Sequence, residues 1–143
     1  MVDKDVLKQR LLLLCEYIDD LENAGGISYE EFLQDKVTRR YIERTLQLAI
    51  EACLDIGGHI IADLRLREPE DNKDIFTVLV ENGFLKEEKK DDYQKMIGFR
   101  NVIVHDYVRL DAEIVFRVLL GSIDDLRDFA RAIKDRFIET GSK

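Results

Sequence analysis

The sequence predicts an all-α protein, an up-and-down bundle of four to five main helices, on three observations. Proline occurs once, at Pro69, while Leu, Glu, Lys and Arg, which favour helices, are abundant. Apolar residues recur every three or four positions over long stretches, so each stretch would place them on one face of a helix. The longest β-branched run, residues 102–104, is too short to form a sheet. With 143 residues, the chain suits one domain spanning 1–143.

The first helix is expected near residues 3–23, where apolar residues at helical spacing are Leu7, Leu11, Leu14, Ile18 and Leu21. Gly25 and Gly26 are expected to end it, because glycine readily takes the left-handed conformation common at helix C-termini. Ser28 is expected to begin a short second helix, since Glu31 completes a capping-box pattern.

A long helix is expected from about residue 37 to residue 67. Its apolar stripe consists of Ile42, Leu46, Ala49, Cys53, Ile56, Ile60 and Leu64. Gly57 and Gly58 interrupt it, and each costs about 1 kcal/mol of helix propensity relative to alanine. Either another helix approaches closely at this point or the long helix kinks there.

Three further helices complete the expected bundle. A short helix carries Ile75, Phe76, Leu79 and Val80 and ends at Asn82-Gly83. Residues 86–100 are expected to be helical, with the charged run 86–92 facing solvent. Asp111 is a suitable N-cap for the last helix. That helix has an apolar stripe of Val115, Leu119, Ile123, Leu126, Ala130, Ile133 and Phe137.

Composition limits the class of protein. Cys15 and Cys53 are too few for a disulfide scaffold or a four-cysteine zinc site, and apolar neighbours suggest that both are small core residues. No apolar run approaches the roughly 20 residues that span a bilayer, and no signal peptide is recognisable, so a cytoplasmic protein is expected. The net charge of −8 argues against broad nucleic-acid binding, because phosphates are bound mainly by Lys and Arg. Any RNA binding therefore needs a local arginine cluster.

The sequence contains two histidines, His59 and His105. His59 lies in the middle of the long helix and is interpreted as a buried or interface residue with a hydrogen-bond partner. His105 lies between Arg100 and Tyr107, and these three residue types suit phosphoryl chemistry. Arginine binds phosphate oxygens, histidine transfers protons near neutral pH, and tyrosine orients a phosphate or stacks on a base. A structural role is the alternative for Arg100 and His105. In that role their side chains would donate hydrogen bonds to the last backbone carbonyls of a helix.

The spacing of these three residues predicts a change in backbone geometry. Five residues turn a helix by about 500°, so Arg100 and His105 would point well apart on an unbroken helix. Arg100 and Tyr107 would share a face. For all three side chains to converge, the chain is expected to leave helical geometry between Val102 and Leu110.

The segment Arg100-Asn101-x3-His105-x-Tyr107 matches the Arg-x4-His-x-Tyr signature of HEPN ribonucleases. The residues of this segment, together with the following Leu110-Asp111, resemble the HepT branch of that superfamily. The likeness extends over most of the chain, through residues 28–33, 41–44 and 49–60. The position of the motif before a long last helix makes the resemblance more specific than three residues alone would be.

The resemblance implies an endoribonuclease toxin that needs no metal ion or other cofactor and acts as a homodimer. Its catalytic residues would be Arg100 and His105, with Asn101 and Tyr107 in supporting roles. RNA cleavage through the 2′-hydroxyl calls for a base and an acid. One chain offers a single histidine for this chemistry, whereas two facing motifs offer two. A close crossing of two copies would also explain Gly57-Gly58.

The resemblance also implies a partner, the minimal nucleotidyltransferase antitoxin MntA, in a type VII HEPN/MNT pair. In that family the antitoxin transfers AMP onto the motif tyrosine, here Tyr107. Each AMP would add about one negative charge and a large base beside a phosphate-binding cleft, and so exclude RNA. Neither DNA nor a membrane is an expected partner. Phosphate-steering residues would come from Arg39, Arg40, Arg44, Arg65, Arg67 and Arg109.

Two other functions remain open at this point. The acidic charge also fits a non-catalytic HEPN helper module that binds a nucleotidyltransferase or a nucleotide. A bundle that serves only for dimerisation is the third possibility.

Overall fold

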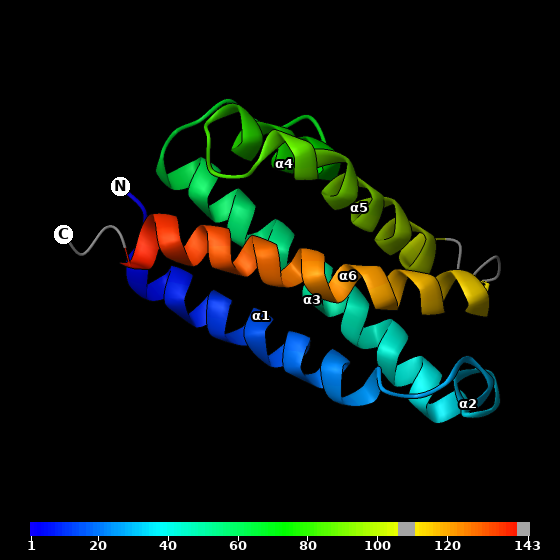
Figure 1. Ribbon diagram of the computed structural model, residues 1–143. Helices are drawn as coiled ribbons and strands as arrows, with labels where there is room; N and C mark the ends of the chain where they lie inside the picture. Colours follow the sequence, from blue (N-terminus) through cyan, green and yellow to red (C-terminus); the bar gives the residue numbers. More distant parts are fainter. Residues whose placement is uncertain (106–110, 140–143) are drawn as a thin grey trace.

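The computed structural model describes residues 1–105 and 111–139. Within these ranges it contains six α-helices and no strand, which confirms the predicted all-α bundle. The helices are α1 (Lys4–Ala24), α2 (Tyr29–Gln34), α3 (Lys36–Asp63), α4 (Asn72–Glu81), α5 (Lys90–His105) and α6 (Ala112–Ile133). A 3-10 turn, η1 (Glu87–Lys89), precedes α5, and a π-helical stretch, η3 (Lys134–Glu139), continues α6. In Figure 1, α3 and α6 lie between α1 on one side and α4 and α5 on the other.

Helix α3 is the centre of the bundle and packs against the five other helices. Its buried face includes Ile42, Leu46, Ala49, Ile50, Cys53, Ile56 and Ile60, each fully excluded from solvent. By length and composition α3 could cross a membrane, although no such stretch is expected from the sequence. Half of its most apolar 18-residue window is buried against the rest of the bundle, as in the core helix of a globular domain.

Side-chain caps fix several helix starts where the sequence predicts them. Glu31 N–H donates to Ser28 Oγ over 3.2 Å, and Ser28 N–H donates to Glu31 Oε1 over 3.3 Å, which completes the predicted capping box. Asp111 accepts from the backbone N–H of Glu113 over 2.8 Å and caps α6 as expected. Each cap satisfies donors that a helix N-terminus otherwise leaves unpaired.

The two glycine predictions have different outcomes. Gly25 ends α1, but its φ of −78° is right-handed, so the expected left-handed conformation is wrong. A Cβ there would lie 2.8 Å from the Leu21 carbonyl oxygen, and this lack of space explains the glycine. At Gly57 a Cβ would lie 2.6 Å from Ile75 Cγ2. A close approach therefore exists at Gly57, but the neighbour is α4 of the same chain, and α3 stays helical through this point.

Three other expectations are corrected by the structure. The long helix ends at Asp63 instead of residue 67, and Arg65 beyond it has a φ of 54°. Cys53 is buried, which raises the pKa of its thiol, but Cys15 is exposed and is not a core residue. Lys89 of the charged run does not simply face solvent, because its ammonium pairs with Asp125 and Asp128 of α6.

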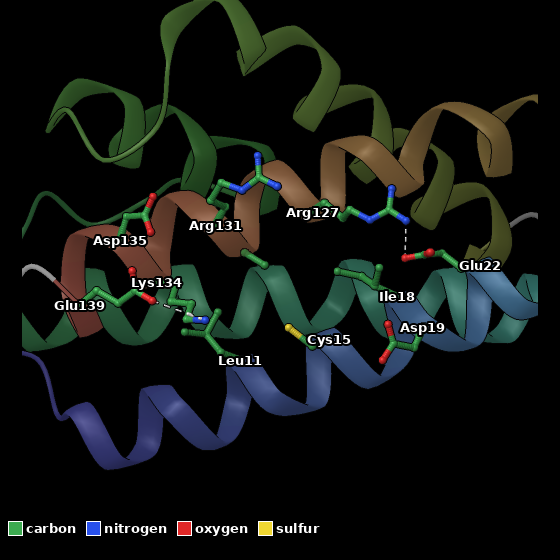
Figure 2. Close-up of a pocket in the computed structure, with 11 residues that line it drawn as sticks. Leu11, Cys15, Ile18, Asp19, Glu22, Arg127, Arg131, Lys134, Asp135 and Glu139 are labelled. Carbon is green, nitrogen blue, oxygen red and sulfur yellow. Dashed lines mark ion pairs between the residues drawn. The ribbon is translucent and has the colours of Figure 1, made fainter.

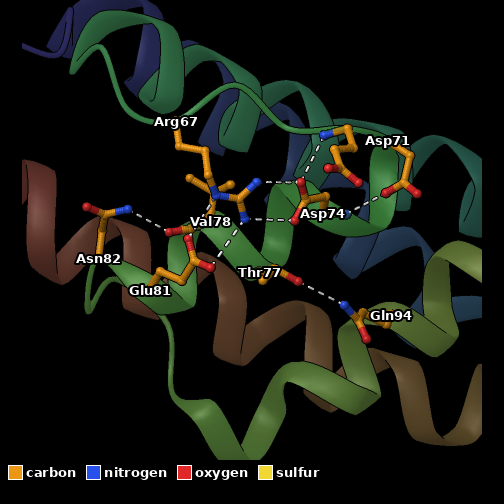
Figure 3. Close-up of polar contacts among 9 residues, drawn as sticks. Arg67, Asp71, Asp74, Thr77, Val78, Glu81, Asn82 and Gln94 are labelled. Carbon is orange, nitrogen blue, oxygen red and sulfur yellow. Dashed lines mark hydrogen bonds and ion pairs between the residues drawn. The ribbon is translucent and has the colours of Figure 1, made fainter.

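Arg67 holds the loop after α3 against α4 (Figure 3). Its guanidinium donates to both carboxylate oxygens of Asp74, over 2.7 and 2.9 Å, and to Glu81 over 3.1 Å. These hydrogen bonds from Arg67 lower the pKa of Asp74 to about 2. Arg67 therefore has a structural role in the described chain.

Candidate active site

The side chain of Arg100 is held at the contact between α5 and α3. Its Nε and Nη2 both donate to Oε2 of Glu51, over 3.1 and 2.9 Å. Its Nη1 donates to Oδ1 of the neighbouring Asn101 over 3.3 Å. The Arg100 side chain is 19% exposed and that of Glu51 is 33% exposed, so the pair lies at the surface of the bundle and is only partly shielded from water. The guanidinium is thus both fixed and within reach of a ligand.

Glu51 is a functional candidate that the sequence analysis did not single out. It lies on α3, and its Oε2 also accepts a 3.3 Å hydrogen bond from Gln47, one turn earlier. The sequence carries a signal for it, because Glu51 is the only charged residue in the apolar run 48–54. A carboxylate within such a run needs a partner, since burying an unpaired charge is costly. Only the fold identifies that partner as Arg100.

His105 is the last residue of α5, and its side chain is exposed. The helix is unbroken from Arg100 to His105, so these two side chains point about 140° apart around its axis. Within the described residues, no hydrogen bond or ion pair links them. The expected departure from helical geometry is therefore absent up to His105. Tyr107 and Arg109 lie outside the described residues.

His59 has a partner outside this site. Its Nε2 lies 3.1 Å from Oδ2 of Asp63, one turn further along α3, without the alignment of a hydrogen bond. The same carboxylate oxygen accepts a 2.9 Å hydrogen bond from the backbone of Asp3. The contact therefore joins the end of α3 to the start of α1. His59 is half-buried beside an acidic residue, but its buried Nε2 has no hydrogen-bond partner, so the expected hydrogen bond is absent.

The arginines that were expected to steer phosphates differ in their contacts and lie at both ends of α3. Arg39 donates to the carbonyl of Leu33 over 2.8 Å, and Arg67 is bound by two carboxylates. Arg65 follows the end of α3, opposite to the end that carries Arg40 and Arg44. Arg40 and Arg44 are exposed and form no hydrogen bond or ion pair with another described residue.

A pocket between two helices lies away from the motif residues. Figure 2 shows it between α1 and α6, with a volume of about 420 Å³. Leu11, Ile18 and Ala130 supply its apolar lining, while its polar side chains carry both signs of charge and include the Arg127–Glu22 ion pair. Neither Arg100 nor His105 contributes to it, so it is not the site of the predicted chemistry.

Chemically, the described residues suit charge stabilisation and proton transfer on a phosphate ester. Arg100 supplies a fixed cation, and His105 supplies an exposed imidazole five residues further along the same helix. No group of three or more His, Cys, Asp or Glu side chains suited to a metal ion occurs in ranges 1–105 and 111–139. One chain brings a single described histidine to this surface, so both an acid and a base would require a second imidazole.

Comparison with known families and proteins gives a consistent result. The family model described as "Ribonuclease HepT-like" matches residues 14–133. An "mRNA nuclease HepT" of Shewanella oneidensis is 36% identical over 130 residues, which cover 91% of this chain and 97% of that protein. A "tRNA nuclease HepT" of Aphanizomenon flos-aquae is 27% identical over 137 residues, which cover 96% and 93%.

Solved structures agree with the fold. The tri-AMPylated HEPN toxin of Shewanella oneidensis in complex with an MNT antitoxin superposes with a TM-score of 0.84 at 30% identity, over 92% of this chain and 98% of that one. YutE of Bacillus subtilis, described as a cytosolic protein of unknown function, superposes with a TM-score of 0.85 over 98% and 93%. At 24% identity, this second likeness supports the fold alone.

Proposed function

The chain belongs to the HepT-like ribonuclease family, and from this premise we propose that it is a metal-independent endoribonuclease, the toxin of a type VII HEPN/MNT pair. The observation that carries the proposal is the Arg100–Glu51 contact, which fixes a cation at the surface of the same helix that ends in His105. The relatives described as mRNA and tRNA nucleases support RNA as the substrate. We also propose a cytoplasmic location, where mRNA and tRNA occur.

In the proposed mechanism, the catalytic residues come from two copies of the chain. The His105 imidazole of one copy takes the proton of the 2′-hydroxyl, whose oxygen attacks the adjacent phosphorus. His105 of the other copy protonates the departing 5′-oxygen. The Arg100 guanidinium stabilises the negative charge that develops on the phosphate oxygens, with Asn101 in support. The products are a 2′,3′-cyclic phosphate and a 5′-hydroxyl end.

An exposed apolar surface near His105 supports the proposed homodimer. Val102 and Val104 on α5 and Ile114 on α6 are exposed, as are Val37 and Tyr41 at the start of α3. Figure 1 places the start of α3, the end of α5 and the start of α6 at one end of the bundle. Exposed apolar side chains on the elements at this end of the bundle favour association. A second copy placed there would bring two His105 residues together.

The proposed activity is tested by incubating the purified chain with end-labelled RNA, with and without EDTA. We expect equal cleavage rates under both conditions and cyclic phosphate ends on the products. A rate that collapses with EDTA and recovers on addition of a divalent metal would contradict metal independence. Absence of cleavage in every condition would instead favour the helper-module alternative, which the net charge of −8 also suits.

Glu51→Gln is expected to lower kcat by about tenfold and Glu51→Ala by up to about a hundredfold, because Arg100 loses the carboxylate that orients it. Glu51 is in this respect a positioning residue. Steady-state measurements that separate kcat from KM test this. Gln47→Ala is the matched control, since it removes only a 3.3 Å contact to the same carboxylate. A loss of activity that merely follows a lowered Tm would contradict the orienting role.

Regulation by a nucleotidyltransferase is the second part of the proposal. The described complex of the Shewanella toxin with an MNT antitoxin supports such a partner, and its AMPylation supports AMP transfer to this chain. We place the AMP on Tyr107 because the motif resemblance implies that residue. Coexpression with an MntA-type nucleotidyltransferase is expected to add AMP to Tyr107 and abolish cleavage. Peptide mass spectrometry checks the site, and adenylate on another residue would overturn the assignment. Tyr107→Phe should prevent the modification.

A further inference from the structure

Two arginines lie on the polar stripe of α3 that leads to Glu51. Arg40, Arg44, Gln47 and Glu51 fall within about 60° of one another around the helix. Gln47 connects the stripe to the active-site contact through its hydrogen bond to Glu51. The two arginines therefore share a face with the carboxylate that holds Arg100.

Arg40 and Arg44 differ from the arginines that the fold engages through carboxylates, although Arg65 and Arg131 are also exposed without a carboxylate partner among the described residues. Arg10, Arg117 and Arg127 have carboxylate partners, as do Arg67 and Arg100. Arg40 and Arg44 have none among the described residues, and both are exposed. They are also four residues apart, a spacing at which like charges destabilise a helix. No contact among the described residues offsets the repulsion between these two cations one turn apart, whereas a phosphate ligand would offset it.

The direction of the helices places the pair on the same side of the Arg100–Glu51 contact as His105. Helices α3 and α5 run in opposite directions (Figure 1). Moving from Arg100 to His105 covers about 7.5 Å along α5, and moving from Glu51 back to Arg44 covers about 10.5 Å along α3 in the same general direction. Arg40 lies about 6 Å further along α3 in that direction, one helical turn beyond Arg44.

We propose that Arg40 and Arg44 form a binding subsite for the phosphodiester backbone of an RNA strand, and that they hold phosphates flanking the scissile linkage. The inference rests on the proposed ribonuclease function. Guanidinium groups bind phosphate oxygens through paired donors, and two of them about 6 Å apart can engage neighbouring phosphates of one strand. The subsite supplies the local positive charge that an acidic protein needs in order to bind RNA.

The test measures binding of a short fluorescent 2′-O-methyl oligoribonucleotide, which lacks the attacking hydroxyl and cannot be cut. The Arg40→Ala/Arg44→Ala double variant is expected to raise Kd by about tenfold or more. The slope of log Kd against log salt concentration should fall by about 1.4, because each phosphate contact on a single strand contributes about 0.7. Arg40→Lys/Arg44→Lys should retain most of the slope.

The matched control is Lys8→Ala/Arg131→Ala, which removes two exposed positive charges from α1 and α6. It should leave Kd nearly unchanged, and an equal loss in both double variants would reduce the effect to net charge and overturn the proposal. Wild-type RNA affinity in the Arg40→Ala/Arg44→Ala variant would also overturn the proposal. So would a variant that loses dimerisation or antitoxin binding but keeps its RNA affinity. If the wild-type chain cleaves RNA, these results contradict the subsite and leave the proposed ribonuclease function in place. If it neither cleaves nor binds RNA, the ribonuclease proposal itself fails.

Discussion

His105→Ala is expected to reduce the rate of RNA cleavage by at least about a thousandfold, because proton transfer by a positioned side chain contributes 10²- to 10⁴-fold and His105 would serve as both acid and base. The His105 side chain is exposed, so its removal should leave the fold and the Tm unchanged. Single-turnover cleavage of end-labelled RNA measures the effect. His59→Ala is the matched control, since it removes the other histidine and leaves the proposed site untouched.

Arg100→Ala is expected to produce a loss of similar size for a different reason. It removes the cation proposed to stabilise the phosphate and leaves Glu51 without its Arg100 partner. Arg100→Lys keeps the charge but loses the two donors that contact Glu51, so it should remain strongly impaired. Full activity in His105→Ala or in Arg100→Ala would show that the motif residues do not perform the chemistry.

Phe76→Ala is expected to lower the free energy of unfolding by about 3–5 kcal/mol, a large share of a typical domain's stability. Phe76 is fully buried, stacks on Tyr93 at a centroid distance of 5.2 Å and contacts Phe129 edge-on at 5.8 Å. These rings join α4, α5 and α6, so the cavity would lie where these three helices meet. Urea unfolding at one fixed protein concentration measures the change.

Leu12→Ala is the control for this variant. Leu12 lies on α1 and is 71% exposed, so its truncation should change stability by no more than about 0.5 kcal/mol. A loss below about 1 kcal/mol for Phe76→Ala would mean that the aromatic contacts do not form the core described above.

The helices could be predicted from the sequence because their signals are local. The stripe of α6 and the caps at Ser28 and Asp111 each follow from residues a few positions apart. Contacts between residues that are distant in the sequence were harder to predict. Lys89 belongs to a charged run, and only the packing of α5 against α6 shows that it pairs with Asp125 and Asp128.

Some residues of the candidate site could be proposed from the sequence for the same reason. The motif indicates Arg100 and His105, because their spacing along the chain is itself the signal. Glu51 lies 49 residues from Arg100, and no periodicity relates the two positions. Likewise, the sequence could not separate Arg40 and Arg44 from Arg39 and Arg67, because the partners that occupy the latter two belong to the fold. At Gly57 the sequence correctly indicates a close approach of another helix, but it does not identify that helix. The neighbour is α4 of the same chain and not a helix of a second copy.

The central claim is that one cleavage site is built from two chains, and a heterodimer of wild-type and His105→Ala subunits tests it most directly. Two different affinity tags on the subunits allow the mixed dimer to be purified. If each site needs an imidazole from both copies, the heterodimer should cleave RNA nearly as slowly as the His105→Ala homodimer. A heterodimer that retains half of the wild-type rate would show that each chain carries a complete site of its own, and would contradict the account.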